Sequence, residues 1–347
     1  MKIAFFTEMG FKGKIPRTHP NMRTEFAWMC NLEADHYNLS DTPEETYDLG
    51  IVINSKKNPH LVNVERYKTR CSKVGVMQEG PFWYFQDYDL ANQIGYYNNL
   101  LDADIIFTHN EQDKKYFKGL TNHKDVRILP TLVIEDATGV LSKEDRSGIM
   151  IGGNMVSWYG GFDSFMLAKS VTDEIYQPAM GRKQEGEEQL GIKQLPYLQW
   201  DGWIKELNKR KLGVHMMRTH AAGTFALNCS LLGIPCVGYK GLDTQRILHP
   251  NLSVEDGDLE TARKLVNKLW NNLELYKNAY VESFEIEMDI VETLEYQSIA
   301  EWDSVGHMGM IANVEDAFDI MLDIDDVIDF SSYNKGKELL EKYEIKF

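Results

Sequence analysis

The chain has 347 residues, 43% of them hydrophobic, and a formal net charge of −16. At about 100–200 residues per domain, this length predicts two or three domains with buried cores. No stretch approaches the ~18–20 apolar residues of a membrane span, and the opening MKIAFF is too short for a signal peptide, so we expect a cytoplasmic protein without a transmembrane segment. The four cysteines form no C-x-x-C pair, which argues against a zinc site or a disulfide framework.

Short apolar runs alternate with helical segments over the first part of the chain. The expected strands are 2–7, 50–54, 73–77, 104–108 and 127–129, and the expected helices are 90–101 and 111–119. Such alternation is typical of a parallel sheet with helices on both faces. We therefore expect a Rossmann-like domain over residues 1–135, with the stretch 130–147 as a linker.

The same pattern starts again after the linker. Strands are expected at 148–151, 174–179, 212–216 and 235–239, and helices at 200–210 and 259–280. This repetition predicts a second Rossmann-like domain over residues 148–283.

The negative charge is concentrated at the end of the chain. Residues 284–347 hold 17 Asp or Glu and four Lys or Arg, a net charge of −13, which leaves −3 for residues 1–283. A break of this kind marks a domain boundary near residue 284 and argues against nucleic acid as a partner, because phosphates repel an acidic segment.

A double glycine follows the first expected strand of the second domain. Gly152 and Gly153, with Asn154 beside them, would let backbone N–H groups approach a ligand, since no Cβ intervenes. A tight turn without a ligand is the alternative interpretation.

The segment THAAGTFALNCSLLGIPCVG (219–238) predicts a loop of small residues, a helix from Thr224 to Leu232 and a further strand. Gly223 and Thr224 would leave free N–H donors at the helix N-terminus, where the helix dipole also favours an anion such as a diphosphate. His220 and Asn228 flank this loop, and we expect both to contact the ligand; an ordinary hydrogen-bonded histidine is the alternative for His220.

Over most of residues 1–280 the chain resembles the GT-B glycosyltransferases. GTFALNCSLLGIPCVG is similar to their donor-binding region, and ADIIFTHNE (103–111) resembles the end of their N-terminal domain. The resemblance implies an N-terminal acceptor domain, a C-terminal domain that binds a nucleotide-diphosphate sugar, and no metal. Many retaining members carry two glutamates where this chain has His220 and Asn228, so the stereochemistry of transfer stays open.

Charged residues near the strand ends supply candidates for catalysis. Arg182 and Lys183 follow the strand at 174–179, where cations would stabilise a departing diphosphate. Exposed loop charges are the alternative interpretation of this pair. Each of His19, Glu79 and His109 is a candidate for the base that deprotonates an acceptor hydroxyl.

Apolar positions at three- and four-residue steps predict an amphipathic helix from Ser304, capped by Asp303 or by Ser304 itself, and a last helix at 337–343. Asp303-Ser304-Val305 resembles the Asp-Ser-Leu motif of acyl carrier proteins, and the similar spacing and acidity extend over the rest of the tail. The resemblance implies a small all-α carrier domain in which Ser304 bears 4′-phosphopantetheine, with a phosphopantetheinyl transferase or an acyl-transfer enzyme as partner. Its first helix would have to be about 262–283, which also closes the preceding domain.

These features predict an α/β protein of two Rossmann-like domains in the GT-B arrangement, followed by a small all-α acyl-carrier-like domain at 284–347. The expected activity is that of a glycosyltransferase of hexosyltransferase type, with a nucleotide-diphosphate sugar as donor and a glycan, a lipid or a small molecule as acceptor. One alternative is a non-hydrolysing sugar-nucleotide epimerase, which shares the two-domain architecture. The other is a non-catalytic nucleotide-sugar-binding or scaffold protein, an alternative suggested by the absence of the glutamate pair.

Overall fold

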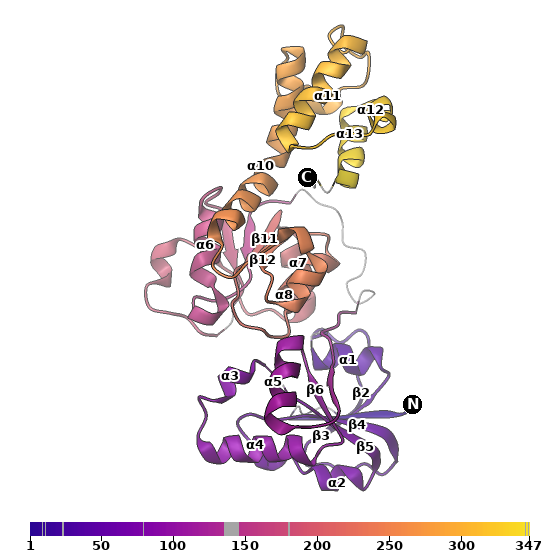
Figure 1. Ribbon diagram of the computed structural model, residues 1–347, viewed down its shortest axis with the longest axis vertical. Coiled ribbons are helices and arrows are strands. Elements are labelled where there is room, and N and C mark those ends of the chain that lie inside the picture. The colour runs from indigo at the N-terminus through magenta and orange to yellow at the C-terminus, as the bar shows by residue number, and fades with distance from the viewer. Residues whose placement is uncertain are drawn as a thin grey trace. The chain divides into compact units, whose positions relative to one another are not determined.

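The computed structural model describes the chain except for residues 9, 11, 23, 79, 135–145, 180, 344 and 346. The chain divides into two compact units, Met1–Ala262 and Arg263–Phe347. The first contains two sheets and the second is helical (Figure 1). This division lies before the charge break at residue 284, because helix α10 (Leu259–Phe284) runs without interruption across it.

The first sheet has seven strands in the order β2-β3-β1-β4-β5-β6-β7, all parallel except β2. The strands are β1 (Ile3–Thr7), β2 (Gly13–Lys14), β3 (Asp35–Asn38), β4 (Tyr47–Ile53), β5 (Cys71–Met77), β6 (Ile105–Thr108) and β7 (Val126–Ile128). The helices are α1 (Glu25–Asn31), α2 (Val64–Lys68), α3 (Phe82–Phe85), α4 (Leu90–Asp102) and α5 (Glu111–Thr121).

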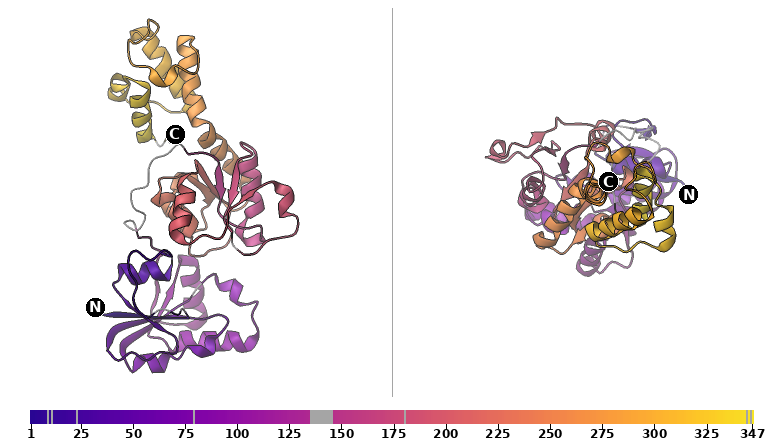
Figure 2. Two further views of the ribbon diagram at one scale, coloured as in Figure 1. Left: turned by 180° about the vertical axis from the view of Figure 1, so that it is seen from behind. Right: turned by 90° about the horizontal axis from the view of Figure 1, so that it is seen from above.

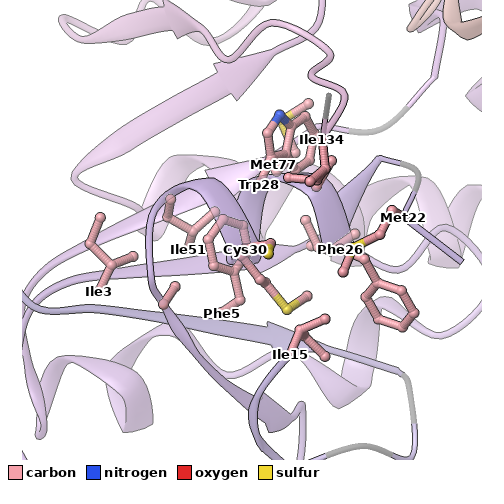
Figure 3. Packing of buried hydrophobic residues seen from close by; sticks show 14 of the residues in the cluster. Ile3, Phe5, Ile15, Met22, Phe26, Trp28, Cys30, Ile51, Met77 and Ile134 are labelled. Carbon is pink, nitrogen blue, oxygen red and sulfur yellow. The ribbon is translucent and has the colours of Figure 1, made fainter. Parts of the chain in front are cut away.

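Both faces of this sheet are buried, which explains why its strands are continuous apolar runs. In β1, Ile3 and Phe5 pack with α1 on one face, while Ala4 and Phe6 pack with α2, α4 and α5 on the other. Figure 3 shows the first of these cores, in which Trp28 of α1 lies beside Met77 and Ile134.

The second sheet has six parallel strands in the order β10-β9-β8-β11-β12-β13. The strands are β8 (Ile149–Ile151), β9 (Ile175–Gln177), β10 (Lys193–Gln194), β11 (Leu212–His215), β12 (Cys236–Tyr239) and β13 (Ser253–Val254). The helices that follow the strands are α6 (Gly161–Lys169), α7 (Trp200–Asn208), α8 (Thr224–Leu231) and α9 (Asp243–Leu248). Helix α6 covers one face, and α7 and α8 cover the other (Figures 1 and 2).

The two sheets belong to one unit because residues of each half pack and hydrogen-bond with the other. Trp200 and Ile204 of α7 are buried in the core that contains α1. The Thr131 hydroxyl donates to the Ala222 carbonyl over 2.6 Å, and the Glu111 N–H donates to the Asp243 carboxylate over 3.0 Å.

The second unit consists of most of α10 together with α11 (Ser304–Phe318), α12 (Ile324–Asp329) and α13 (Tyr333–Leu340). These helices share one aromatic-rich core, in which Tyr276, Tyr280, Trp302 and Tyr333 are almost completely buried. A single helix thus serves as the first helix of this bundle and extends back into the preceding unit.

Most of the predicted elements are confirmed, including the helices that start at Thr224 and Ser304. The last helix begins at Tyr333 and not at 337. Among the elements that the sequence did not predict are α1, which begins after a residue of positive φ, and β3, whose residues Asp-His-Tyr-Asn are polar. Strand β3 forms because it pairs with β1 on one side and β2 on the other. Its own sequence contains no apolar run that would predict a strand.

Candidate functional site

The candidate donor site lies at the carboxyl edge of the second sheet, between β8 and β11. The chain leaves β8 toward β9 and leaves the adjacent β11 toward β12, in opposite directions along the sheet. Such a switch point opens a crevice in which α/β proteins bind their ligands. The double-glycine loop follows β8 and the small-residue loop follows β11, so the fold brings the two predicted loops to this crevice.

Helix α8 presents an uncapped N-terminus there. Its N-cap is Gly223, with φ 67° and no side-chain capping hydrogen bond. The first N–H groups of a helix have no intrahelical partner, and here the dipole adds a partial positive charge. Ala221, Ala222 and Thr224 line a cavity, whereas Gly223 itself is buried against Thr244. The N-terminus of α8 is therefore open to a ligand from the side of Thr224.

The double-glycine loop packs tightly on its surroundings. A Cβ at Gly152 would overlap the ring of His215, and the Gly153 carbonyl accepts a hydrogen bond from Gln177 over 3.0 Å. Asn154 is 4% exposed; its Oδ1 accepts the Val156 N–H over 3.2 Å, and within the described chain its Nδ2 has no hydrogen-bond partner. Of this loop, Gly152 lines one of the cavities described below, whereas Asn154 lines none of them.

His215, at the end of β11, is the buried titratable group beneath this loop. It is 5% exposed, and complete desolvation lowers its pKa to about 4, so the ring is neutral at physiological pH. Its ring lies against Tyr159 and Phe225, and neither nitrogen has a hydrogen-bond partner among the residues described.

A cavity of about 430 Å³ is lined by both halves of the first unit. Its lining residues are Thr24, Lys56, Gly80, Pro81, Trp83, Tyr84, His109, Trp158, Tyr159, Arg182, Met217, Thr219, Ala221, Ala222 and Thr224. We call it the cationic cavity because Lys56 and Arg182 border it. The Arg182 guanidinium lies 5.7 Å from the Trp158 ring and 5.9 Å from the Tyr84 ring, and the Lys56 ammonium lies 5.2 Å from Tyr84. Aromatic faces orient both cations beside the α8 N-terminus.

A second, smaller cavity of about 120 Å³ is also lined by Thr224. Its lining is Gly152, Pro178, Ala179, Leu195, Pro196, Tyr197, Leu198, Trp200, Trp203, Thr224, Phe225 and Asn228, and we call it the aromatic cavity. Asn228 is buried there, and its Oδ1 accepts a hydrogen bond from the Trp200 indole over 3.3 Å. An apolar slot with a few polar groups suits a flat ring system.

The structure separates His220 from Asn228. His220 is half-buried and faces Gly241, and it borders neither the cationic nor the aromatic cavity as these are described. Burial lowers its pKa, an effect that Asp243 and Asp256 oppose. Lys183 is exposed and likewise absent from both linings, whereas Arg182 borders the cationic cavity.

The three candidate bases have different surroundings. His109 is 6% exposed, stacks on Trp28 at 5.4 Å and lines the cationic cavity. His19 accepts the Asn21 N–H and packs on Phe26, away from both described cavities. Glu79 lies outside the described residues. Of the described candidates, His109 alone reaches the cationic cavity.

Tyr197 and Trp200, which line the aromatic cavity, belong to the segment 195–200 that resembles the approach to the donor site in GT-B enzymes. The aromatic residues of the cationic cavity and Lys56 were not predicted from the sequence. The aromatic run Phe-Trp-Tyr-Phe at 82–85, which follows β5 after four residues and forms the short helix α3, was an available signal, because three of its aromatic side chains are only half-buried. Among the described residues, no group of three or more His, Cys, Asp or Glu could hold a metal ion. In the same part of the chain, no helix is long and apolar enough to span a membrane.

Ser304 is the first residue of α11 and is exposed. Asp303, not Ser304, is the N-cap: its carboxylate accepts the N–H groups of Val305 and Gly306, each over 2.9 Å. The capping function is therefore fulfilled without the serine hydroxyl. Val305 and Met308, next to Ser304 on the helix surface, are 80% and 56% exposed.

The sequence matches no protein-family model and no curated protein. Several solved structures share its fold. Anabaena HepE in complex with UDP and glucose is 11% identical over 79% of this chain and 91% of its own, with a TM-score of 0.53. An alpha-glucosyltransferase in complex with UDP-glucose and DNA containing an abasic site is 12% identical over 78% of this chain and 91% of its own, with a TM-score of 0.51.

A third similar structure, TarM, is 10% identical over 85% of this chain and 54% of its own, with a TM-score of 0.50, so the chain corresponds to about half of that protein. At such identities the likeness concerns the fold. The chain therefore has the two-sheet α/β fold expected of the GT-B type.

Proposed function

We propose that the first unit is a glycosyltransferase of hexosyltransferase type, which moves a sugar from a nucleotide-diphosphate sugar to an acceptor hydroxyl. The observation that carries the proposal is the N-terminus of α8. It is uncapped, it lies at the switch point of a parallel sheet, and it borders two cavities of different chemistry. A nucleotide sugar has the matching three parts, a flat base, a doubly charged diphosphate and a polar sugar.

The two cavities assign these parts. The aromatic cavity, with two tryptophans and the Asn228 amide, suits the nucleoside. Thr224 borders both cavities, so a diphosphate at its N–H would extend from one into the other. Arg182 and Lys56 then face the diphosphate, where they neutralise the negative charge that develops as it leaves. His109 lies in the same cavity and is the described candidate for a proton acceptor.

Gly152 of the double-glycine loop lines the aromatic cavity, so this loop contributes to the same site. The ligands in the similar structures, UDP with glucose and UDP-glucose, make UDP-glucose the first donor to test.

Incubation with UDP-, GDP- and ADP-sugars, with and without a mixture of acceptors, tests this function. We expect one donor to stabilise the protein, by about 2.7 kcal/mol at 100 times its dissociation constant. We also expect free nucleoside diphosphate and a glycosylated product. Conversion of the donor to its epimer, without release of nucleoside diphosphate, would favour a sugar-nucleotide epimerase. Stabilisation without any product would favour a non-catalytic binding protein.

For the second unit we propose a carrier function, with 4′-phosphopantetheine attached to Ser304. Three features support it: the hydroxyl is exposed, Asp303 has taken the capping role, and four helices in the order long, long, short and short share one core. The exposed Val305 and Met308 would face the enzyme that attaches or acylates the arm.

Intact-mass measurement after treatment with a promiscuous phosphopantetheinyl transferase and coenzyme A tests the carrier function. The wild type should gain the mass of one arm and Ser304→Ala should gain none. An unmodified wild type, with the helical content of the unit intact by circular dichroism, would contradict the carrier role. It would leave the glycosyltransferase proposal untouched.

A further inference from the structure

Helix α9 connects the turn before α8 with the other half of the first unit. Its first turn carries Asp243, Thr244 and Gln245 in succession. Successive residues of an α-helix point about 100° apart around its axis, so these side chains face different neighbours. Each of the three forms a hydrogen bond with a different segment of the chain.

Gln245 and Thr244 hold α9 and the turn before α8 together. The Gln245 side chain is 1% exposed, and its amide donates to the carbonyl of Cys236, the first residue of β12, over 2.7 Å. The Thr244 hydroxyl donates to the Gly223 carbonyl over 3.0 Å. The start of α9 is therefore anchored in the second half and supports the turn from which α8 begins.

Asp243 contacts the first half instead. Its carboxylate accepts the Glu111 N–H over 3.0 Å and a hydrogen bond from the Arg246 guanidinium over 3.1 Å. Glu111 is the first residue of α5, and its N–H is one of the donors that a helix leaves without an intrahelical partner. The side chain of the N-cap Asn110 accepts the Asp113 N–H, so Asp243 supplies a second cap to α5 from the other half of the unit.

This second cap ties His109 to α9. His109 lies between the end of β6 at Thr108 and the N-cap Asn110, two residues before Glu111. Two residues span at most about 7 Å, so the bond at the Glu111 N–H confines the backbone of the histidine relative to α9. His109 is 6% exposed and lines the cationic cavity, which the N-terminus of α8 also borders.

We propose that Asp243 is a positioning residue for sugar transfer. Its hydrogen bond to the Glu111 N–H holds His109 in place relative to the N-terminus of α8, so that the proton acceptor faces the sugar whose diphosphate this helix binds. The inference rests on the proposed transfer reaction and on His109 as its proton acceptor. Because Asp243 lines neither the cationic nor the aromatic cavity, it should affect the rate of transfer and not the binding of the nucleotide.

Removing the hydrogen bond from each of its two sides tests this role. Asp243→Ala deletes the acceptor, whereas Asp243→Asn keeps an acceptor oxygen without the charge. Glu111→Pro deletes the donor N–H and leaves Asp243 intact. Proline suits the first position of a helix, and the preceding Asn110 already has the extended backbone, φ −147° and ψ 166°, that a following proline requires. Leu90→Pro is the matched control, since Leu90 is the exposed first residue of α4 and lines neither cavity.

The assay uses the full chain with UDP-glucose as donor and a mixture of methyl glycosides and octan-1-ol as acceptors. Calorimetry with UDP measures the donor site alone and shows that a variant is folded. We expect Asp243→Ala and Glu111→Pro to lower kcat for transfer roughly ten- to hundredfold, the effect of a small misplacement of a reacting group, with the affinity for UDP unchanged. Asp243→Asn and Leu90→Pro should keep most of the wild-type kcat.

Two combined variants show whether Asp243 acts through the predicted partners. Asp243→Ala together with Glu111→Pro should lower kcat no further than either change alone, because both remove the same bond. Asp243→Ala added to His109→Gln should have no further effect on kcat, because the aspartate acts only by placing the histidine.

The inference is overturned if Asp243→Ala and Glu111→Pro transfer sugar at the wild-type rate, or if they weaken UDP binding with kcat unchanged. It is also overturned if Asp243→Asn is as slow as Asp243→Ala, or if Asp243→Ala still lowers kcat in the His109→Gln protein. In each of these cases the wild type transfers sugar and the proposed function stands. A wild type that neither binds UDP nor releases it from UDP-glucose would contradict the proposed function instead.

Discussion

Replacing Gly223 with alanine should remove nucleotide binding, and Gly233 at the other end of α8 provides the matched control. The two glycines have φ of 67° and 63°, a left-handed conformation that costs other L-residues about 1–2 kcal/mol. Both alanine variants incur this cost. At Gly223 the new methyl group would also overlap the Thr244 hydroxyl, which donates to the Gly223 carbonyl over 3.0 Å; at Gly233 nothing lies within 4 Å.

The expected stability losses follow from these surroundings. Gly233→Ala should lower the free energy of unfolding by about 1–2 kcal/mol, and Gly223→Ala by about 1 kcal/mol more because the Thr244 hydrogen bond is lost. Urea unfolding measures both, and titration calorimetry with UDP measures binding, which Gly223→Ala should abolish and Gly233→Ala should preserve. A further Thr244→Ala change should recover part of the stability of Gly223→Ala. If Gly223→Ala binds UDP as tightly as the wild type, the reasoning about this turn is refuted.

Three further predictions concern charge, pH and capping. Arg182→Gln should weaken UDP binding about tenfold or more, because a hydrogen bond from a charged group contributes about 1.5–3 kcal/mol. Calorimetry measures this affinity, and an unchanged value would show that Arg182 does not contact the diphosphate. Burial raises the pKa of Asp113 to about 6. Between about pH 4 and 6 the folded state therefore keeps this carboxyl proton, while the unfolded state, in which Asp113 has the ordinary pKa of an aspartate, loses it. The free energy of unfolding should fall by on the order of 3 kcal/mol as the pH rises over this range. Asp113→Asn should flatten that dependence in urea unfolding, and equal pH slopes for the two proteins would contradict the assignment. Asp303→Ala should destabilise the second unit by about 1 kcal/mol, whereas Ser304→Ala should not, since Asp303 makes both capping bonds; the reverse order in thermal unfolding would restore Ser304 as a cap.

The predicted strands and helices were accessible from sequence because the signals are local. Parallel strands buried on both faces are apolar runs, and α8 lies between a glycine that must adopt positive φ and a Gly-x-Pro stop. The unit boundary was less accessible. Charge depends on the surface residues of a segment, whereas the compact unit begins at Arg263, within α10, and its aromatic core includes α10 residues from Leu273 onward.

The part of the site on helix α8 was predicted because its signals are also local. Thr224 and Asn228 are one helical turn apart and share the aromatic cavity, as helical geometry requires. His220 precedes the turn at Gly223, whose positive φ redirects the chain and leaves the histidine facing Gly241. The spacing of eight residues between His220 and Asn228 does not show this change in the direction of the chain.

The cavities themselves are assembled from segments far apart in the chain. Trp83 comes from α3, Trp158 from the loop after β8 and Arg182 from the loop after β9, and they meet through the packing of the two halves. Lys56 joins them from the loop after β4. No periodicity links such positions, so their proximity follows from the tertiary structure.

A structure of the protein with UDP bound tests the central claim most directly. Phosphate oxygens should lie about 3 Å from the Thr224 N–H, with the guanidinium of Arg182 on their other side and the uracil ring in the aromatic cavity. A diphosphate bound elsewhere, with the N-terminus of α8 hydrogen-bonded only to water or to protein, would contradict the account.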